Sequence, residues 1–203
     1  MYQQAQQECM MINAELGHVK SVPEFYTEIR KQQEEAHGEH YCLMHDAIKE
    51  VWESGNCAEY MELGTHQGGT ASLAFQLPNV KKVQLVDIDM SRYRKFLSPL
   101  AYKWCTEKNI ELVLKELDSR SLGSIGRCDL LVIDSVHNYG FMQKELEIHG
   151  HNVRKFIVAH DTAELLGRKD NQLHRCLSEY AERNGWKVLK QSLYGPGFTV
   201  IGK

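Results

Sequence analysis

Residues 59–75 read E-Y-M-E-L-G-T-H-Q-G-G-T-A-S-L-A-F, and this segment is the most informative in the chain. It predicts a short apolar strand, a glycine turn and the start of a helix. Glycine tolerates positive φ and has no Cβ, so a ligand can approach the backbone of such a turn closely. The free N–H groups at the start of the helix face the end of the strand, which makes residues 64–70 a candidate cradle for a small-molecule cofactor.

Glu62, near the end of this strand, sets the charge that the cradle would accept. A carboxylate at the strand tip would repel a diphosphate but attract an amino group or a sulfonium. We therefore expect a ligand that is cationic at that end.

The composition is that of an ordinary globular domain, with 203 residues of which 42% are hydrophobic and 25% charged. A formal net charge of −3 gives no global attraction to nucleic acid or anionic membranes. The first ten residues lack the pattern of a secretory signal, and no run approaches the ~20 apolar residues of a membrane span. We expect a cytoplasmic protein with a small-molecule substrate and without nucleic-acid or membrane partners.

The cysteines and histidines show no spacing typical of a structural zinc site. Cys57 and Cys128 begin apolar runs and are expected to pack as small hydrophobic residues. Several histidines lie in polar or charged stretches, and most of these are expected to be solvated: His37, His40, His45, His149 and His151.

Apolar runs alternate with helical patterns after residue 56. Strands are expected over residues 57–63, 82–86, 111–117, 129–133, 155–159, 186–191 and 198–201, and helices over 70–75, 92–106, 141–149 and 172–184. Such alternation predicts a doubly wound α/β domain with a largely parallel sheet covered on both faces. Gly195, Pro196 and Gly197 favour a turn between the last two strands, which predicts an antiparallel final pair.

Two amphipathic segments, residues 22–35 and 41–53, precede this pattern. We expect residues 1–56 to form a helical extension and residues 57–203 to form the cofactor-binding domain. The extension would serve as a lid over the substrate or as a contact in a homo-oligomer. Met10, Met11, Phe25 and Tyr26 would line such a surface, and ordinary packing against the domain is the alternative for them.

Acidic residues follow the first five expected strands, at the sheet edge where α/β proteins bind ligands. They are Glu62, Asp87 with Asp89, Asp118, Asp134 and Asp161. A single acid of this kind is commonly a loop or N-cap residue. Acids at the ends of five strands are harder to explain as loop or N-cap residues. An acid after the second strand can accept both hydrogens of a ribose diol, and Asp87 is favoured over Asp89 because it comes first after the strand.

The segment 59–75, together with L-V-D-I-D, I-D-S-V-H-N-Y and V-A-H-D-T, resembles the class I S-adenosylmethionine-dependent methyltransferases. Within that class it is similar to the small-molecule O-methyltransferases with D-G-x-H-x-Y and H-D-T signatures. The resemblance covers residues 57–203. It implies a Rossmann-like seven-stranded sheet of order 3-2-1-4-5-7-6 with the seventh strand antiparallel.

The resemblance also implies roles for individual residues. Glu62 and the loop residues Gly64, Thr65, His66, Gly68 and Gly69 would surround the methionine part of the cofactor, Asp87 would bind the ribose, Ile88 would face the adenine, Asp118 and Ser119 would lie at the adenine edge, and Asp134 would also contact the cofactor. Ser135 replaces the glycine of the family motif and could narrow the site or add a hydrogen bond.

Asp134 and Asp161 would end neighbouring strands in this topology, so their carboxylates could converge. Two hard oxygen ligands suit Mg²⁺ or a similar ion. Metal-binding members of the resembling group use an acidic pair after the fifth strand, where this chain has His160 and Asp161. Since imidazole suits Mn²⁺, Fe²⁺ or Zn²⁺ better, the metal differs, or His160 is no ligand, or the site holds no metal.

His137 matches the histidine of the family motif and is the candidate catalytic base, with Asp134 beside it. Methyl transfer from a sulfonium needs an oxygen nucleophile, and a positioned base typically contributes ~10²- to 10⁴-fold. With a bound cation, Asp134 would act as a ligand rather than as a base. The alternative for His137 is a helix-entry residue that only hydrogen-bonds the backbone.

Two other classes of protein compete with this prediction. An NAD(P)-dependent oxidoreductase would need G-x-G-x-x-G after the first strand, whereas this chain has E-L-G-T-H-Q-G-G. A non-catalytic binding module on the same fold is the second alternative, since fold alone does not establish activity. The acceptor stays open among sugars, polyketide hydroxyls, phenols and peptides, and so does N-methylation.

Overall fold

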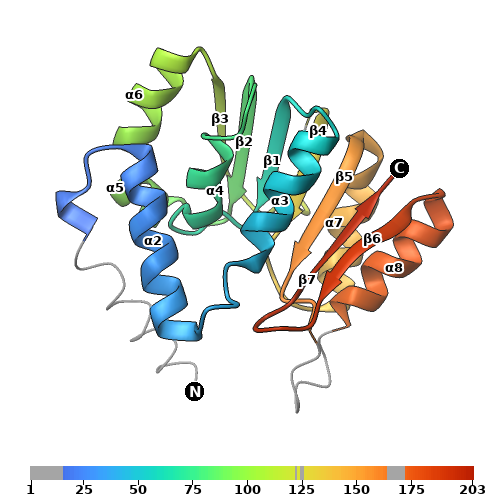
Figure 1. Ribbon diagram of the computed structural model, residues 1–203. Coiled ribbons are helices and arrows are strands. Elements are labelled where there is room, and N and C mark those ends of the chain that lie inside the picture. Colours follow the sequence, from blue (N-terminus) through green and yellow to red (C-terminus); the bar gives the residue numbers. More distant parts are fainter. Residues whose placement is uncertain (1–15, 122, 124–125, 164–171) are drawn as a thin grey trace.

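The fold is that of a computed structural model, which describes residues 16–121, 123, 126–163 and 172–203 (Figure 1). Met10 and Met11 lie outside the described residues. From β1 onward, strands and helices largely alternate along the described chain, as the hydrophobic pattern predicts, while β3 is followed directly by β4 and β6 by β7 in the order of described elements.

Seven strands form one sheet in the order β3-β2-β1-β4-β5-β7-β6. Neighbouring strands are parallel, except that β7 runs antiparallel to both β5 and β6. The expected strand order and the reversed seventh strand are therefore confirmed. The strands are β1 (Glu59–Leu63), β2 (Lys82–Asp87), β3 (Glu111–Glu116), β4 (Cys128–Ile133), β5 (Val153–His160), β6 (Lys187–Ser192) and β7 (Phe198–Gly202).

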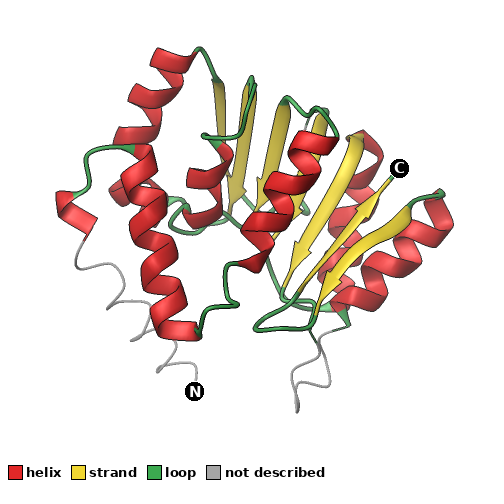
Figure 2. Ribbon diagram, viewed as in Figure 1, coloured by secondary structure: helices red, strands yellow, loops and turns green. Residues whose placement is uncertain are grey.

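Helices cover both faces of the sheet (Figure 2). Because side chains alternate along a strand, Leu130 and Val132 of β4 pack toward one face, and Leu131 toward the other. The first face carries α2 (Val22–His37), α3 (Leu43–Ser54), α4 (Gly69–Ala74), α5 (Ser91–Phe96) and α6 (Ser98–Lys108). The second carries α7 (Tyr139–His149) and α8 (Leu173–Asn184), and two short 3-10 helices are η1 (Leu16–His18) and η2 (Gly150–Asn152).

The single helix expected over residues 92–106 is wrong, because α5 ends at Phe96 and α6 begins at Ser98. Pro99 lies in the first turn of α6, where its missing N–H leaves no hydrogen bond unmade. In the middle of one long helix the same residue would remove a backbone hydrogen bond and clash with the preceding turn. A proline therefore divides this segment into two helices.

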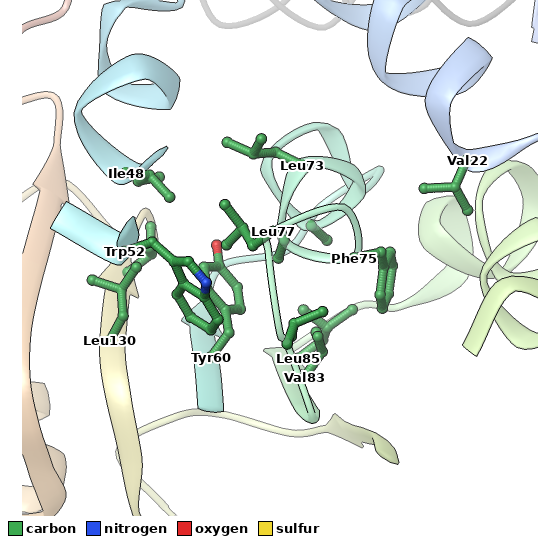
Figure 3. Packing of buried hydrophobic residues seen from close by; sticks show 14 of the residues in the cluster. Val22, Ile48, Trp52, Tyr60, Leu73, Phe75, Leu77, Val83, Leu85 and Leu130 are labelled. Carbon is green, nitrogen blue, oxygen red and sulfur yellow. The ribbon is translucent and has the colours of Figure 1, made fainter. Parts of the chain in front are cut away.

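Helices α2 and α3 belong to the core of the first face. Phe25 of α2 and Trp52 of α3 are both buried, and Figure 3 shows Trp52 close to Tyr60 of β1. The indole N–H of Trp52 donates to the carbonyl of Pro78 at 2.8 Å. Ordinary packing, the alternative for Phe25, is therefore confirmed. Among the described residues, none of the helices has both the length and the apolar character required to traverse a bilayer.

Candidate functional site

A cavity of about 340 Å³ lies at the carboxyl ends of β1, β2, β3 and β4. In open α/β sheets the ligand site is expected where the strand order reverses, and here that point lies between β1 and β4. The volume falls within the range of about 300 to 1,000 Å³ that is usual for small-molecule sites. The sheet topology thus places a ligand-sized cavity where a cofactor is expected.

Gly64 forms the turn at the tip of β1 in a conformation with φ +89°. Its N–H donates to the carbonyl of Val86, and the N–H of Asp134 donates to the carbonyl of Leu63. A Cβ on Gly64 would lie 2.1 Å from the carbonyl oxygen of Asp134. Only glycine fits this position, since both the backbone conformation and the close approach of β4 exclude a side chain.

Asp87 borders the cavity at the end of β2. Its Oδ2 accepts the backbone N–H of His66 at 2.7 Å, and its Oδ1 accepts the N–H of Asp89 at 3.0 Å. Asp89 itself is exposed and accepts the N–H of Ser91 at the start of α5. Of the two acids considered for ribose binding, only Asp87 therefore lines the cavity.

Apolar side chains form much of the cavity wall. Ile88 is 72% exposed and Val136 49% exposed, although both are large hydrophobic residues. Phe141, at the start of α7, completes the apolar part of the lining. Exposed apolar side chains that rim a cavity mark a surface that a ligand covers.

The expected cofactor residues divide into two groups. Seven line the cavity: Gly64, His66, Asp87, Ile88, Asp118, Ser119 and Asp134. Four do not line it: Glu62, Thr65, Gly68 and Gly69. The sequence patterns did not indicate Arg120 or Phe141, whose ring lies 4.1 Å from the Arg120 guanidinium. Arg120 directly follows Ser119, and this position next to an expected cofactor residue could have indicated that Arg120 lines the cavity.

Glu62 lies in the interior below the turn and is 1% exposed. Its Oε2 accepts the hydroxyl of Tyr60 at 2.6 Å. Burial raises the pKa of Glu62 to about 8, against the opposing hydrogen bond from Tyr60. The described structure therefore holds this carboxyl in the interior, outside the cavity lining, and it is substantially protonated at neutral pH.

A cluster of acids and histidines adjoins the cavity at the ends of β4 and β5. His137 Nδ1 lies 2.9 Å from Asp161 Oδ2, and His137 Nε2 lies 3.5 Å from Asp134 Oδ1. His160 Nδ1 lies 3.1 Å from the same Asp134 oxygen. Asp161 has φ +53°, which is uncommon for a residue other than glycine and is a feature that concentrates at functional sites. Asp134 and Asp161 thus converge, with His137 between them.

The charges of this cluster depend on one another. Burial alone would lower the pKa of His137, but hydrogen bonds with Asp134 and Asp161 raise it to about 10. Burial likewise opposes ionisation of Asp134, yet the charges of His160 and His137 hold the pKa of that carboxyl far below its usual range. The pKa of His160 is raised because Asp134 outweighs its burial. At neutral pH, His137 therefore carries a proton between two carboxylates.

The same cluster offers ligand atoms for a metal ion. One ligand atom each from Asp134, His137 and Asp161 can lie within 4.8 Å of one another. This group does not include His160, which the expected set contained, although its Nδ1 lies 3.1 Å from Asp134 Oδ1 and 3.8 Å from Asp161 Oδ2. Two carboxylates with one imidazole suit Mn²⁺, Fe²⁺ or Zn²⁺ better than Mg²⁺.

The N-terminal helices reach this cluster. A small cavity of about 30 Å³ lies between Asp134 and His160 on one side and residues of α2, α3 and their connection on the other. His45 of α3 is 4% exposed, and its Nε2 lies 3.2 Å from the Thr70 hydroxyl. Burial lowers the pKa of His45 to about 3, so this histidine is neutral. The expectation that it is solvated is wrong, because folding brings Thr70 of α4 against it.

No family model and no curated protein matches this sequence. Solved structures with the same fold are nevertheless numerous. An S-adenosylmethionine-dependent methyltransferase from Clostridium acetobutylicum superposes with a TM-score of 0.60 and 10% identity, covering 87% of this chain and 97% of that one.

Two further structures extend the comparison. The magnesium protoporphyrin IX methyltransferase of Synechocystis, solved with bound S-adenosylhomocysteine, has a TM-score of 0.58 and 12% identity over 98% of this chain and 94% of that one. An O-methyltransferase family protein from Burkholderia thailandensis has a TM-score of 0.58 and 14% identity over 99% of this chain and 69% of that one. At such identities the likeness shows the fold, which is the Rossmann-like fold of these methyltransferases.

Proposed function

We propose that this protein is an S-adenosylmethionine-dependent methyltransferase that methylates a hydroxyl group of a small molecule. The observation that carries the proposal is the cavity at the reversal of strand order. Its wall contains the exposed apolar side chains of Ile88 and Val136, and its edge holds the carboxylate of Asp87 between two backbone N–H groups. Apolar walls for a flat base and an acid for a diol are the features that recognise an adenosine group.

The charge of the site favours a sulfonium donor over a dinucleotide. The carboxylates of Asp134 and Asp87 line the cavity. A diphosphate near the glycine turn would meet this negative surface, while a positively charged sulfur would be attracted to it. These carboxylates support methyl transfer over the nicotinamide-dependent alternative.

S-adenosylmethionine, when bound, supplies a methyl group that is activated by the positive sulfur. The chain's own residues then have four tasks in the proposal. Asp87 binds the ribose, Ile88 contacts the adenine, and Asp134 attracts the positive end of the donor. His137, which contacts the lining residue Asp134, removes the proton of the acceptor hydroxyl.

The proton on His137 limits this last task. With a pKa of about 10, the imidazole holds its proton at neutral pH and must lose it before it can act as a base. A divalent cation between the carboxylates of Asp134 and Asp161 would compete with that proton. We therefore keep two forms of the proposal, one with His137 as base without metal and one with metal assistance at Asp134, His137 and Asp161.

The N-terminal helices are proposed to cover the acceptor. Tyr41, in the connection between α2 and α3, has its ring centroid 5.9 Å from that of His160. Together with the position of His45 near Asp134, this supports a lid role for residues 1–56 over a contact in a homo-oligomer. Turnover of a panel of hydroxylated and amino acceptors tests whether oxygen is the methylated atom, and we propose a cytoplasmic location.

Asp87→Asn is expected to weaken binding of S-adenosylhomocysteine by roughly 10- to 100-fold, because a charge-assisted hydrogen-bond acceptor is lost. Asp89→Asn is the matched control, since it makes the same change two residues away on an exposed side chain. Isothermal titration calorimetry measures both variants. Equal losses at the two positions would contradict the assignment of the ribose to Asp87, and a wild-type protein that binds NADH but not S-adenosylhomocysteine would favour the oxidoreductase.

A further inference from the structure

Glu145 of α7 is a carboxylate with no exposed surface. Its Oε1 accepts the hydroxyl of Ser119 at 2.6 Å, and its Oε2 accepts the hydroxyl of Ser135 at 2.7 Å. Burial raises the pKa of this carboxyl to about 7. A buried acid persists in a fold when hydrogen bonds satisfy it, and here both oxygens are satisfied by hydroxyls that belong to the cavity lining.

The two serines come from different strands. Ser119 lies in the loop after β3, and Ser135 lies in the loop after β4. In the sheet, β3 and β4 are separated by β2 and β1, so the two loops flank the cavity from opposite sides. One side chain on α7 therefore ties together two loops that no strand pairing connects.

Helix α7 holds the loop after β3 at two further points. His149 Nε2 donates to the carbonyl of Ser119 at 2.8 Å, and the ring of Phe141 packs under the Arg120 guanidinium. Phe141, Glu145 and His149 are spaced four residues apart, so they lie along one face of the helix. That face shapes the part of the cavity where residues 118–120 meet Phe141.

Ser135 stands where the resembling family has glycine. In this chain its hydroxyl completes the second half of the contact with Glu145. A glycine at the same position would leave Oε2 of a fully buried carboxyl without this donor. Ser135 and Glu145 therefore act as one hydrogen-bonded unit.

We propose that Glu145 is a positioning residue for the nucleoside end of the methyl donor, acting through the hydroxyls of Ser119 and Ser135. The inference rests on the proposed function, since it assigns the adenosine group to this cavity. Glu145 itself lies behind the lining and does not touch the ligand. Its effect is to fix the distance between the two loops that receive an adenosine-type nucleoside.

The test compares two ligands that share the nucleoside, S-adenosylhomocysteine and 5′-methylthioadenosine, by isothermal titration calorimetry. Glu145→Gln leaves one serine without its carboxylate acceptor and is expected to weaken both ligands by the same factor, about 3- to 10-fold. Ser135→Gly, which keeps the carboxylate, is expected to give a similar loss. Glu147→Gln, on the exposed side of the same helix, is the matched control and should change neither affinity.

A double-variant cycle separates positioning from simple helix anchoring. If Glu145 acts through the serines, Glu145→Gln adds no further loss of affinity in a Ser119→Ala, Ser135→Gly background. Unchanged affinities in a folded Glu145→Gln protein, or fully additive losses in the cycle, would overturn the proposal. A wild-type protein that binds neither ligand would instead refute the proposed function, so the two failures are distinguishable.

Discussion

Gly64→Ala is expected to weaken binding of S-adenosylhomocysteine by at least about 100-fold, because the tips of β1 and β4 must separate. The added Cβ would lie 2.1 Å from the Asp134 carbonyl oxygen, a backbone atom that cannot rotate away. Asp134 would move with its backbone, and with it the contacts to His137 and His160. The variant is also expected to lose roughly 3 to 5 kcal/mol of unfolding free energy, the range of the more severe single substitutions.

Gly38→Ala is the matched control for this prediction. Gly38 has φ +95°, close to the +89° of Gly64, but a Cβ there would have nothing within 4 Å. With φ +95° and ψ 159°, Gly38 lies in a region that is nearly restricted to glycine, so the control carries only the backbone strain, about 1 to 3 kcal/mol. Thermal denaturation and calorimetric titration are measured on both variants. Equal destabilisation at the two glycines, with binding retained at Gly64→Ala, would show that the close approach of β4 is unimportant.

The comparison of these glycines shows what the sequence could predict. The strand, turn and helix around Gly64 follow from local patterns, and so does the need for a positive φ in the turn. The contact between Gly64 and Asp134 depends on the pairing of β1 with β4, whose residues are far apart in the chain. Sequence patterns place each strand tip, but the register between strands sets the distances at the site.

The interior position of Glu62 follows from the alternation of side chains along a strand. Side chains along a strand alternate, so Glu62 shares the face of Tyr60 and not that of Leu63. Tyr60 is fully buried, and its hydroxyl binds the Glu62 carboxylate inside the domain. The alternation could have predicted an interior position for Glu62. Because this buried carboxyl is largely protonated at neutral pH and does not line the cavity, it does not supply the predicted attraction for a cationic ligand.

For the buried residues His45 and His149, in contrast, local sequence patterns predicted the wrong environment. His45 and His149 lie in polar stretches, which predicted solvent exposure. In the fold, Thr70 contacts His45 and the Ser119 carbonyl contacts His149, and both partners come from other elements. Polar residues become buried when distant segments supply hydrogen bonds. Local sequence patterns do not show which distant segments will supply them.

His137 is expected to titrate near pH 10 in the folded protein, well above the ~6.5 of an unperturbed histidine. The cause is its position between the carboxylates of Asp134 and Asp161, which stabilise the protonated ring. NMR titration of the imidazole signals measures this value directly and needs no acceptor. Asp161→Asn should lower it toward the ordinary value. A His137 that titrates near ~6.5 in the unaltered protein would show that the ion pair does not form.

The raised pKa of His137 determines how both the stability of the fold and the turnover rate change with pH. Because the folded-state pKa is raised, the ion pairs of His137 stabilise the fold fully below about pH 6.5 and lose that contribution as the pH rises through about 10. A base works only without its proton, so metal-free turnover of an accepted substrate should rise with pH toward the same value. His137→Gln should lower the turnover by ~10²- to 10⁴-fold and remove the rise.

Added Mn²⁺ decides between the two forms of the proposed mechanism. A cation held by Asp134, His137 and Asp161 would displace the proton of His137, because a ligating imidazole is neutral, and it would lower the pKa of the acceptor hydroxyl in place of a base. Turnover at neutral pH should then increase, and EDTA should reverse the change. His160→Gln is expected to leave the effect of Mn²⁺ in place if His137 is the third ligand, and to abolish it if His160 holds the metal. If neither the titration of His137 nor the turnover rate changes with Mn²⁺ or EDTA, the metal-assisted form is wrong. His137 would then act as the base without metal and would lose its proton only at alkaline pH.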